Sequence, residues 1–249
     1  MRDWQGLFAL GRRQHGALAL SDGERFGWSR NALLLHARRQ GWERPQPGVV
    51  LLPGTQRTFE TRVATALLQV GGRVLAGRRT AAYVLGMVDR PPATVEMVLP
   101  ADRRLPRLEG VEAWRSRTLH RADAINRNGL RLTAPGRTVV DLAAVMGVDR
   151  LRSLMIDARQ RRVVRLEEIA AIHERIGRTP GGPRLTQVLA ELDEECCDSM
   201  LEWYWRRALR AHDLHPHPRP FPFRCADGIT IEIDVAFPDQ WVACECDGL

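Results

Sequence analysis

The sequence predicts an α+β fold in four parts, and three observations lead to this expectation. Apolar residues recur at helical spacing in residues 4–40 and again in residues 149–192. Residues 94–99 and 230–246 instead alternate apolar and polar side chains, which is typical of half-buried strands. Clusters of glycine and proline separate these segments, so we expect domains at residues 1–55, 58–146, 149–192 and 198–249.

Residues 1–55 predict a small helical domain that binds DNA. The pattern indicates helices at residues 4–14 and 21–26, and Ser29 is a suitable N-cap for a third helix that ends near Gln40. A strand follows at residues 49–52. This order of helices and a β-extension is the layout of a winged helix-turn-helix, whose recognition helix enters the major groove.

The third predicted helix carries polar side chains that suit nucleic acid. Arginine contacts phosphates and guanine, and asparagine pairs with adenine. The candidate DNA-binding residues are Arg30, Asn31, Arg38 and Arg39. The alternative is an ordinary helical cap whose basic face is only solvated.

Residues 58–146 predict a mixed α/β unit, and residues 149–192 predict a helical connector. In the first unit we expect helices at 59–69, 80–85 and 135–146, with Pro135 in the first turn of the last one. Strands are expected at 94–99 and 111–114. The connector should hold three helices, at residues 149–160, 166–176 and 183–192.

The C-terminal part begins with a helix that Asp198 or Ser199 caps and that continues to about His212. Its apolar residues Leu201, Trp205 and Leu209 share one face, so we expect that face to pack. Glu202 lies one position around from Leu201, and with Ser199 it matches a capping box, which is its purely structural interpretation.

A β-hairpin is predicted around the turn Pro238-Asp239-Gln240. A turn centred on Asp239-Gln240 places Asp234 opposite Glu245 and Glu232 opposite Asp247. Like charges in directly opposed cross-strand pairs repel, and a hard divalent cation with oxygen ligands would remove the repulsion. The alternative is that these acids simply face water.

Composition favours a soluble cytoplasmic protein with an anionic partner. All 37 basic residues are arginine, and the formal net charge is +7. No stretch is long and apolar enough for a membrane span, so we expect no membrane partner. The five cysteines form no C-x-x-C pair, which argues against a zinc site.

Residues 1–190 resemble AbiEi-family antitoxins. The resemblance rests on the order of RQHG at 13–16, WER at 42–44, PGVV at 47–50, GRRTAAYVLG at 77–86, WRSR at 114–117 and LTAPGRTVVDLA at 132–143. It implies a DNA-binding protein of a toxin–antitoxin system, with autoregulation of transcription as one role.

The C-terminal part resembles the PD-(D/E)xK nucleases, and more closely the very-short-patch-repair endonucleases. The resemblance implies a partial restriction-endonuclease-like fold in which Asp234 and Glu245 bind Mg²⁺ or Mn²⁺. Glu202 matches the acid of the first helix, and Asp247 stands where lysine is commonest. All four acids are therefore candidate catalytic residues, and Asp247 could orient water or bind a second metal.

These expectations combine into a DNA-binding protein with a metal-dependent, endonuclease-like C-terminal domain. The alternative is a non-enzymatic regulator of the antitoxin type whose nuclease domain is vestigial. About fifty residues are marginal for a self-standing α/β core, so we expect the C-terminal domain to be incomplete. A homo-oligomer or a second chain could complete it.

Overall fold

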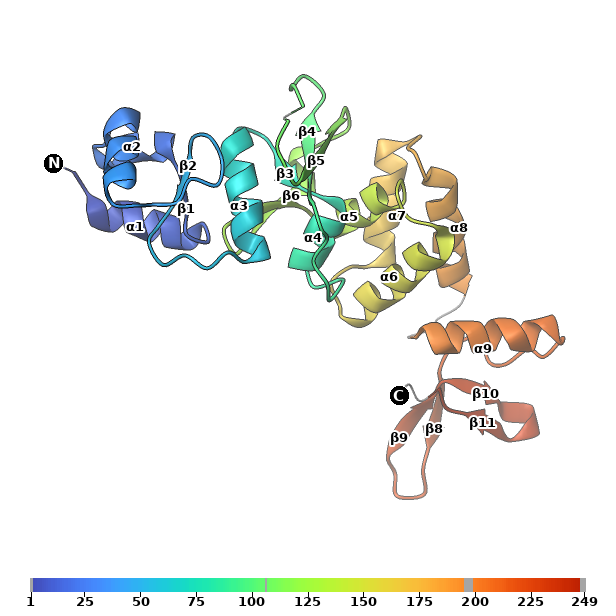
Figure 1. The fold of residues 1–249 in the computed structure, drawn as a ribbon. Helices are drawn as coiled ribbons and strands as arrows, with labels where there is room; N and C mark the ends of the chain where they lie inside the picture. Colours follow the sequence, from blue (N-terminus) through green and yellow to red (C-terminus); the bar gives the residue numbers. More distant parts are fainter. Residues whose placement is uncertain (1, 106, 195–198, 247–249) are drawn as a thin grey trace. The chain divides into compact units, whose positions relative to one another are not determined.

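The computed structural model describes residues 2–105, 107–194 and 199–246, and it divides into two units (Figure 1). Unit 1 spans Met1–Thr138 and unit 2 spans Val139–Leu249. Helices and a mixed sheet occur together in unit 1, and helices occur with short antiparallel strand pairs in unit 2. The predicted α+β class is confirmed at this level.

Unit 1 begins with a helical subdomain closed by a small strand pair. Its elements are α1 (Trp4–Arg13), β1 (Ala17–Ala19), the 3₁₀ helix η1 (Leu20–Phe26), α2 (Arg30–Arg39) and β2 (Val49–Leu51). The Ser29 hydroxyl accepts a hydrogen bond from the Ala32 amide at 3.2 Å, so the predicted N-cap is confirmed. Strand β1, which pairs antiparallel with β2, was not predicted.

Aromatic side chains make up much of the core of this subdomain. Trp28 and Trp42 are buried with Leu7, Leu33 and Ala37, and Trp4 packs against them from α1. Trp4 lies 4.2 Å from Trp28 between ring centroids. Large rings of this kind bury much apolar area in a small domain, and they fix one side of α2 firmly against the core.

The rest of unit 1 is a five-stranded mixed sheet with helices. Its elements are α3 (Phe59–Val70), β3 (Leu75–Ala76), α4 (Arg78–Val84), β4 (Val95–Pro100), β5 (Val111–Ser116), η2 (Arg121–Asp123), β6 (Ala124–Arg127), β7 (Leu130–Thr133) and α5 (Pro135–Leu142), which continues into unit 2. The strand order is β5-β4-β3-β7-β6. Strand β4 runs parallel to β5 and antiparallel to β3, and β3 runs parallel to β7.

The β6–β7 hairpin turns at Asn128-Gly129, where both residues have positive φ angles of 51° and 81°. An Asn-Gly pair with this backbone is the preferred two-residue hairpin turn. A Cβ atom at position 129 would lie 1.9 Å from the carbonyl oxygen of Arg13, so only glycine fits there.

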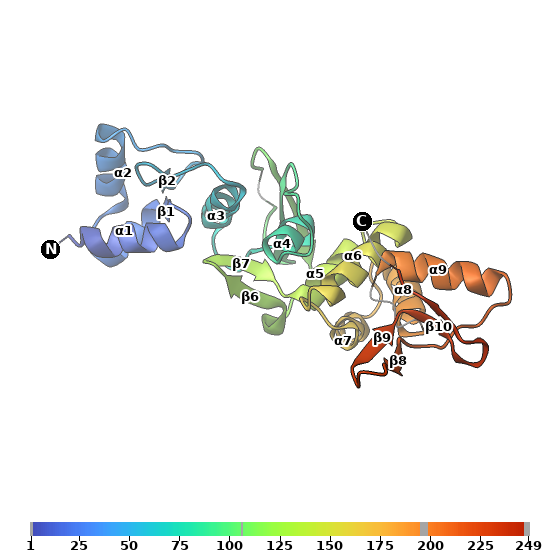
Figure 2. The ribbon, with the colours of Figure 1, turned by 90° about the horizontal axis from the view of Figure 1, so that it is seen from below.

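Unit 2 contains the three predicted connector helices, α6 (Val148–Gln160), α7 (Leu166–Ile176) and α8 (Gly182–Glu194). They are followed by α9 (Met200–Ala211), β8 (Phe221–Arg224), β9 (Thr230–Ile233), β10 (Val235–Phe237), η3 (Pro238–Gln240) and β11 (Val242–Cys244). Figures 1 and 2 both show α9 beside these strands. Strand β8 was not predicted, because Pro222 reads as a loop residue.

The predicted hairpin is confirmed in part and corrected in part. Its turn is η3, and β10 pairs with β11 in the predicted register, with Val235 opposite Cys244. The first strand is interrupted at Asp234, where it changes partner: β9 pairs with β8 instead. Glu232 therefore lies opposite Pro222 on one edge of its strand, and the expected pairing of Glu232 with Asp247 falls outside the described residues, because Asp247 does.

Candidate functional site

Three of the four residues predicted to contact DNA, Asn31, Arg38 and Arg39, lie on the exposed side of α2, opposite the fully buried Leu33 and Ala37. Arg30 is also exposed, but at the start of the helix it stands in the same row as Leu33 and Ala37, and its guanidinium lies near Gly48. Helix α2 is thus held by its apolar side and presents a polar side that is free of the core. This division of faces is what a helix needs to contact a charged polymer without losing its packing.

The formal charge of the two units differs in sign. Residues 1–138 hold 23 arginines and 11 aspartates or glutamates, which gives +12. Residues 139–249 hold 14 arginines and 19 acidic residues, which gives −5. The basic character that the whole chain shows as +7 therefore belongs to the unit that contains α2. Net charge therefore favours unit 1 over unit 2 as the place where an anionic partner would bind.

Two of the unit 1 acids are buried in ion pairs with arginines, and because each pair is neutral, the net charge of the unit is carried by its other residues. Asp123 lies 2.9 Å from the Arg137 guanidinium, and both side chains are nearly inaccessible. Glu96, likewise buried, pairs with Arg79 at 3.0 Å. These pairs join residues 14 and 17 positions apart, so no local sequence pattern could identify them.

The predicted acids of unit 2 are brought together only in part. Glu202 is buried near the start of α9, where its amide donates to the Ser199 hydroxyl at 3.1 Å. Asp234 lies at the break between β9 and β10, and its carboxylate accepts a hydrogen bond from the Cys246 amide at 2.9 Å. Glu245 is exposed and adjoins β11, and Asp247 lies outside the described residues.

The Cys246 thiol lies within electrostatic range of both Glu202 and Asp234. Burial raises the pKa of this thiol, and the negative charges of Asp234 and then Glu202 raise it further, whereas Arg206 lowers it. Asp234 is tied to this region directly, through the amide of Cys246, whereas Glu202 acts on the thiol only through its charge. The paired β10–β11 register, continued by one residue, also places Asp234 opposite Glu245.

Arg206 fixes the backbone at this region. Its side chain is 2% exposed, and its guanidinium donates to the carbonyl oxygens of His217, at 2.7 Å, and of Asp234. These two bonds tie α9 to the strand that carries Asp234. Carbonyl oxygens thus satisfy its two terminal nitrogens, whereas its buried Nε has no hydrogen-bond partner in the described part of the chain.

The face of α9 that packs is not the predicted one. Leu201 and Trp205 are 48% and 43% exposed, whereas Glu202, Trp203 and Arg206 are buried. The expectation that Leu201, Trp205 and Leu209 pack is therefore wrong. The inward face is set by the hydrogen bonds of Arg206 and by Trp203, whose ring lies 4.1 Å from the Arg152 guanidinium carbon.

Carboxylates such as those of Glu202 and Asp234 are the ligands that a hard cation prefers. Mg²⁺ is commonly held by one or two carboxylates and keeps several waters, so Glu202 and Asp234 are compatible with it. Within residues 2–105, 107–194 and 199–246, no group of three or more histidine, cysteine, aspartate or glutamate side chains is arranged to hold a metal ion.

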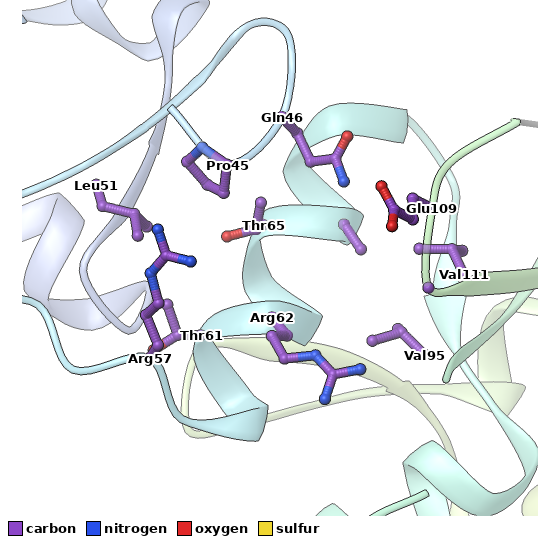
Figure 3. Close-up of a pocket in the computed structure, with 12 residues that line it drawn as sticks. Pro45, Gln46, Leu51, Arg57, Thr61, Arg62, Thr65, Val95, Glu109 and Val111 are labelled. Atoms are coloured by element: carbon purple, nitrogen blue, oxygen red, sulfur yellow. The ribbon is translucent and has the colours of Figure 1, made fainter. Parts of the chain in front are cut away.

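A small cleft in unit 1 lies between the loop before β2, helix α3 and the strands β4 and β5 (Figure 3). It has a volume of about 190 Å³, and Arg57, Arg62 and Glu109 are among its lining residues. Arg57 is paired with Glu43, and Arg62 donates to the Ala93 carbonyl at 2.6 Å. Because both guanidinium groups already have protein partners, the exposed side of α2 is the stronger candidate for binding an anion.

An apolar cleft of about 660 Å³ lies on the strands of unit 2. Phe223, Ile231 and Trp241 line it and are 40%, 43% and 88% exposed, and Glu245 lies at the same cleft. Within the described part of unit 2, no element covers these side chains. Glu245 consequently borders this apolar surface, and it also follows the strand that pairs with β10, next to Asp234.

A search of the described helices for membrane spans finds none with the length and hydropathy that crossing a bilayer requires.

Comparison with known proteins gives little beyond this geometry. No family model matches the chain, and no curated protein matches it. The crystal structure of the RV2827C protein from Mycobacterium tuberculosis is similar, with 18% sequence identity, a TM-score of 0.49 and coverage of 75% of each chain. A likeness at this level carries no argument about function.

Proposed function

We propose that unit 1 binds duplex DNA and that α2 is its recognition helix. The observation that carries the proposal is the exposed set Arg30, Asn31, Arg38 and Arg39 on a helix whose other side is locked into an aromatic core. The charge of +12 on the same unit supports it. In this proposal α1, η1 and α2 form a helix-turn-helix, and β1 with β2 forms a short wing.

The variant Arg30→Ala/Arg38→Ala/Arg39→Ala tests this proposal. Each lost phosphate contact should lower the slope of log affinity against log salt by about one, so the triple variant should lose up to about three. Fluorescence anisotropy with labelled duplex DNA at several salt concentrations measures the slope. The matched control is Arg150→Ala/Arg165→Ala/Arg178→Ala, which removes the same charge from exposed positions of unit 2. Equal slopes for the two variants would refute a contact through α2.

The second candidate function is cleavage of DNA by unit 2 with Mg²⁺ or Mn²⁺. It is favoured by the hydrogen bond between Asp234 and the Cys246 amide, and by Glu202, whose charge also acts on the Cys246 thiol. In this proposal Asp234 and Glu245 would hold the cation, Glu202 would add a further carboxylate, and Asp247 would orient water. The cation, when bound, would neutralise the scissile phosphate and activate water. Arg206 would position Asp234 through its backbone carbonyl.

Incubation of the 249-residue protein with plasmid, single-stranded and mismatched DNA tests this activity, with and without Mg²⁺ or Mn²⁺. Asp234→Ala, Glu245→Ala and Glu202→Gln should abolish cleavage and leave DNA binding intact, because binding belongs to unit 1. Asp239→Asn changes an exposed acid of η3 and should cleave normally. Specific promoter binding without cleavage under any condition supports the rival function, a non-enzymatic regulator of the antitoxin type.

A further inference from the structure

The polar side of α2 contains one large apolar side chain, Leu35. It is 49% exposed, although leucines at the neighbouring positions 33 and 34 are buried or half-buried against the core. A single exposed leucine is ordinary on a protein surface. Here, however, Leu35 and Leu105 are the two large hydrophobic residues that are exposed in the described part of unit 1. Leu35 is the one that lies among the residues proposed to contact DNA.

The helical repeat places Leu35 in line with its polar neighbours. Asn31 precedes it by four residues and Arg38 follows it by three, so the three side chains form one strip along the exposed side. Asn31 and Leu35 are separated by about 6 Å along the helix axis, given a rise of about 1.5 Å per residue. This separation is close to two base-pair steps of about 3.4 Å each.

The chemistry of the strip is selective in the major groove. Asparagine can form two hydrogen bonds with the N6 and N7 edge of adenine. Leucine has no hydrogen-bonding group, and the apolar feature that unmodified DNA offers in the major groove is the C5 methyl group of thymine. A guanine or an unmethylated cytosine at that position would lose the hydration of its polar edge and gain no partner.

Resting on the proposed DNA binding by α2, we propose that Leu35 is a specificity-determining residue that reads a C5 methyl group, with Asn31 reading adenine nearby. The preferred DNA site then contains an adenine and a thymine within about two base-pair steps of each other. Arg38 and Arg39, one turn further along, hold the adjacent phosphates and carry no sequence information. Thymine is the source of the methyl group, because an A·T pair also supplies the adenine that Asn31 recognises.

The test begins with selection of bound sequences from a random duplex library by the full chain. Each thymine of the selected site is then replaced singly by deoxyuridine, which removes only the C5 methyl group. At one or two positions the replacement should weaken binding about fourfold, the factor that burial of one methyl-sized group gives. Restoring a methyl group there as 5-methylcytosine, paired with guanine, should recover affinity in part relative to unmethylated cytosine.

Leu35→Ala should bind thymine and deoxyuridine duplexes with equal affinity, and Leu105→Ala, the matched exposed leucine of unit 1, should keep the fourfold difference. Circular dichroism and tryptophan fluorescence of Leu35→Ala should match those of the wild type, because Leu35 is outside the core.

Two results overturn the inference in different ways. Binding that depends on Arg30, Arg38 and Arg39 but not on any methyl group leaves the proposed function standing and refutes the role of Leu35. An absence of duplex binding by the wild type refutes the proposed function and, with it, the inference.

Discussion

Unit 1 and unit 2 both bury an arginine in ion pairs, and Arg152 of unit 2 pairs with Glu191 and Asp149, but unit 2 also buries a second arginine against backbone carbonyls. In unit 1 the buried Arg137 forms an ion pair with the buried Asp123. In unit 2 the buried Arg206 donates to two backbone carbonyls, and the acids Glu202 and Asp234 remain near a thiol. The first arrangement cancels charge and serves stability. The second brings Glu202 and Asp234 into electrostatic range of one thiol, which makes this region a candidate site.

The surfaces of unit 1 and unit 2 also differ in charge and in polarity. Unit 1 has a formal charge of +12 and exposes arginines on α2, whereas unit 2 has −5 and exposes apolar side chains on its strands. The DNA binding proposed for unit 1 and the DNA cleavage proposed for unit 2 can therefore be tested separately. A substitution in unit 1 should leave the stability and chemistry of unit 2 unchanged, and the reverse should also hold. The following experiments test the differences between the two units.

The largest effect is expected at the buried ion pair of unit 1. Arg137→Leu removes the guanidinium partner of an Asp123 side chain that is 1% exposed, so unit 1 should lose about 3–5 kcal/mol of stability. Hydrogen exchange by mass spectrometry, read on peptides of β4 and β7, measures the loss within unit 1. Arg117→Leu, at an exposed position, should change stability by less than about 0.5 kcal/mol. Similar losses for both variants would contradict a structural role for the pair.

Two tryptophans of unit 2 should respond very differently to truncation. Trp203 is 4% exposed and stacks on Arg152, so Trp203→Ala should cost about 3 kcal/mol or more. Trp241 is 88% exposed, so Trp241→Ala should cost less than about 0.5 kcal/mol. Urea unfolding followed by circular dichroism measures both. A large cost at Trp241 would show that the apolar strand face is covered in solution.

A smaller effect is expected at Cys246, whose pKa is raised by burial and by Asp234 and Glu202. The folded state favours the protonated thiol, so the associated stability is present below the pKa of the unfolded chain and is lost as pH rises through the folded pKa. Glu202→Gln or Asp234→Asn should lower this pKa and allow alkylation at lower pH. Mass spectrometry of the peptide that contains Cys246 gives the pH profile. Unchanged profiles in both variants would contradict the action of these carboxylates on the thiol.

The sequence predicted those elements whose signals are local. Helix α7 was predicted with its observed bounds, because Gly177 ends it and acidic residues begin it. Strand β3 has two residues and offers no periodicity, and β8 contains a proline, so both were missed. The β6–β7 hairpin was missed although Asn128-Gly129 is a usable turn signal.

More of the candidate DNA-binding helix than of the candidate acidic site could be predicted from the sequence. The exposed face of α2 follows from the spacing of its apolar residues, and the β10–β11 register follows from its turn. The inward face of α9 was predicted wrongly, because Arg206 is buried by carbonyls that lie 11 and 28 residues away in the chain. The hydrophobic periodicity of a helix predicts that its apolar side chains face inward. It cannot predict that backbone carbonyls far away in the chain will accept hydrogen bonds from a buried guanidinium.

The most direct test of the account is hydrogen exchange of the full chain with and without saturating duplex DNA. We predict that DNA slows exchange in α2 and in the β1–β2 pair of unit 1, and leaves α6, α7 and α8 of unit 2 unchanged. Protection confined to unit 2, or absent from α2, would contradict the claim that the basic unit binds DNA through its exposed recognition helix.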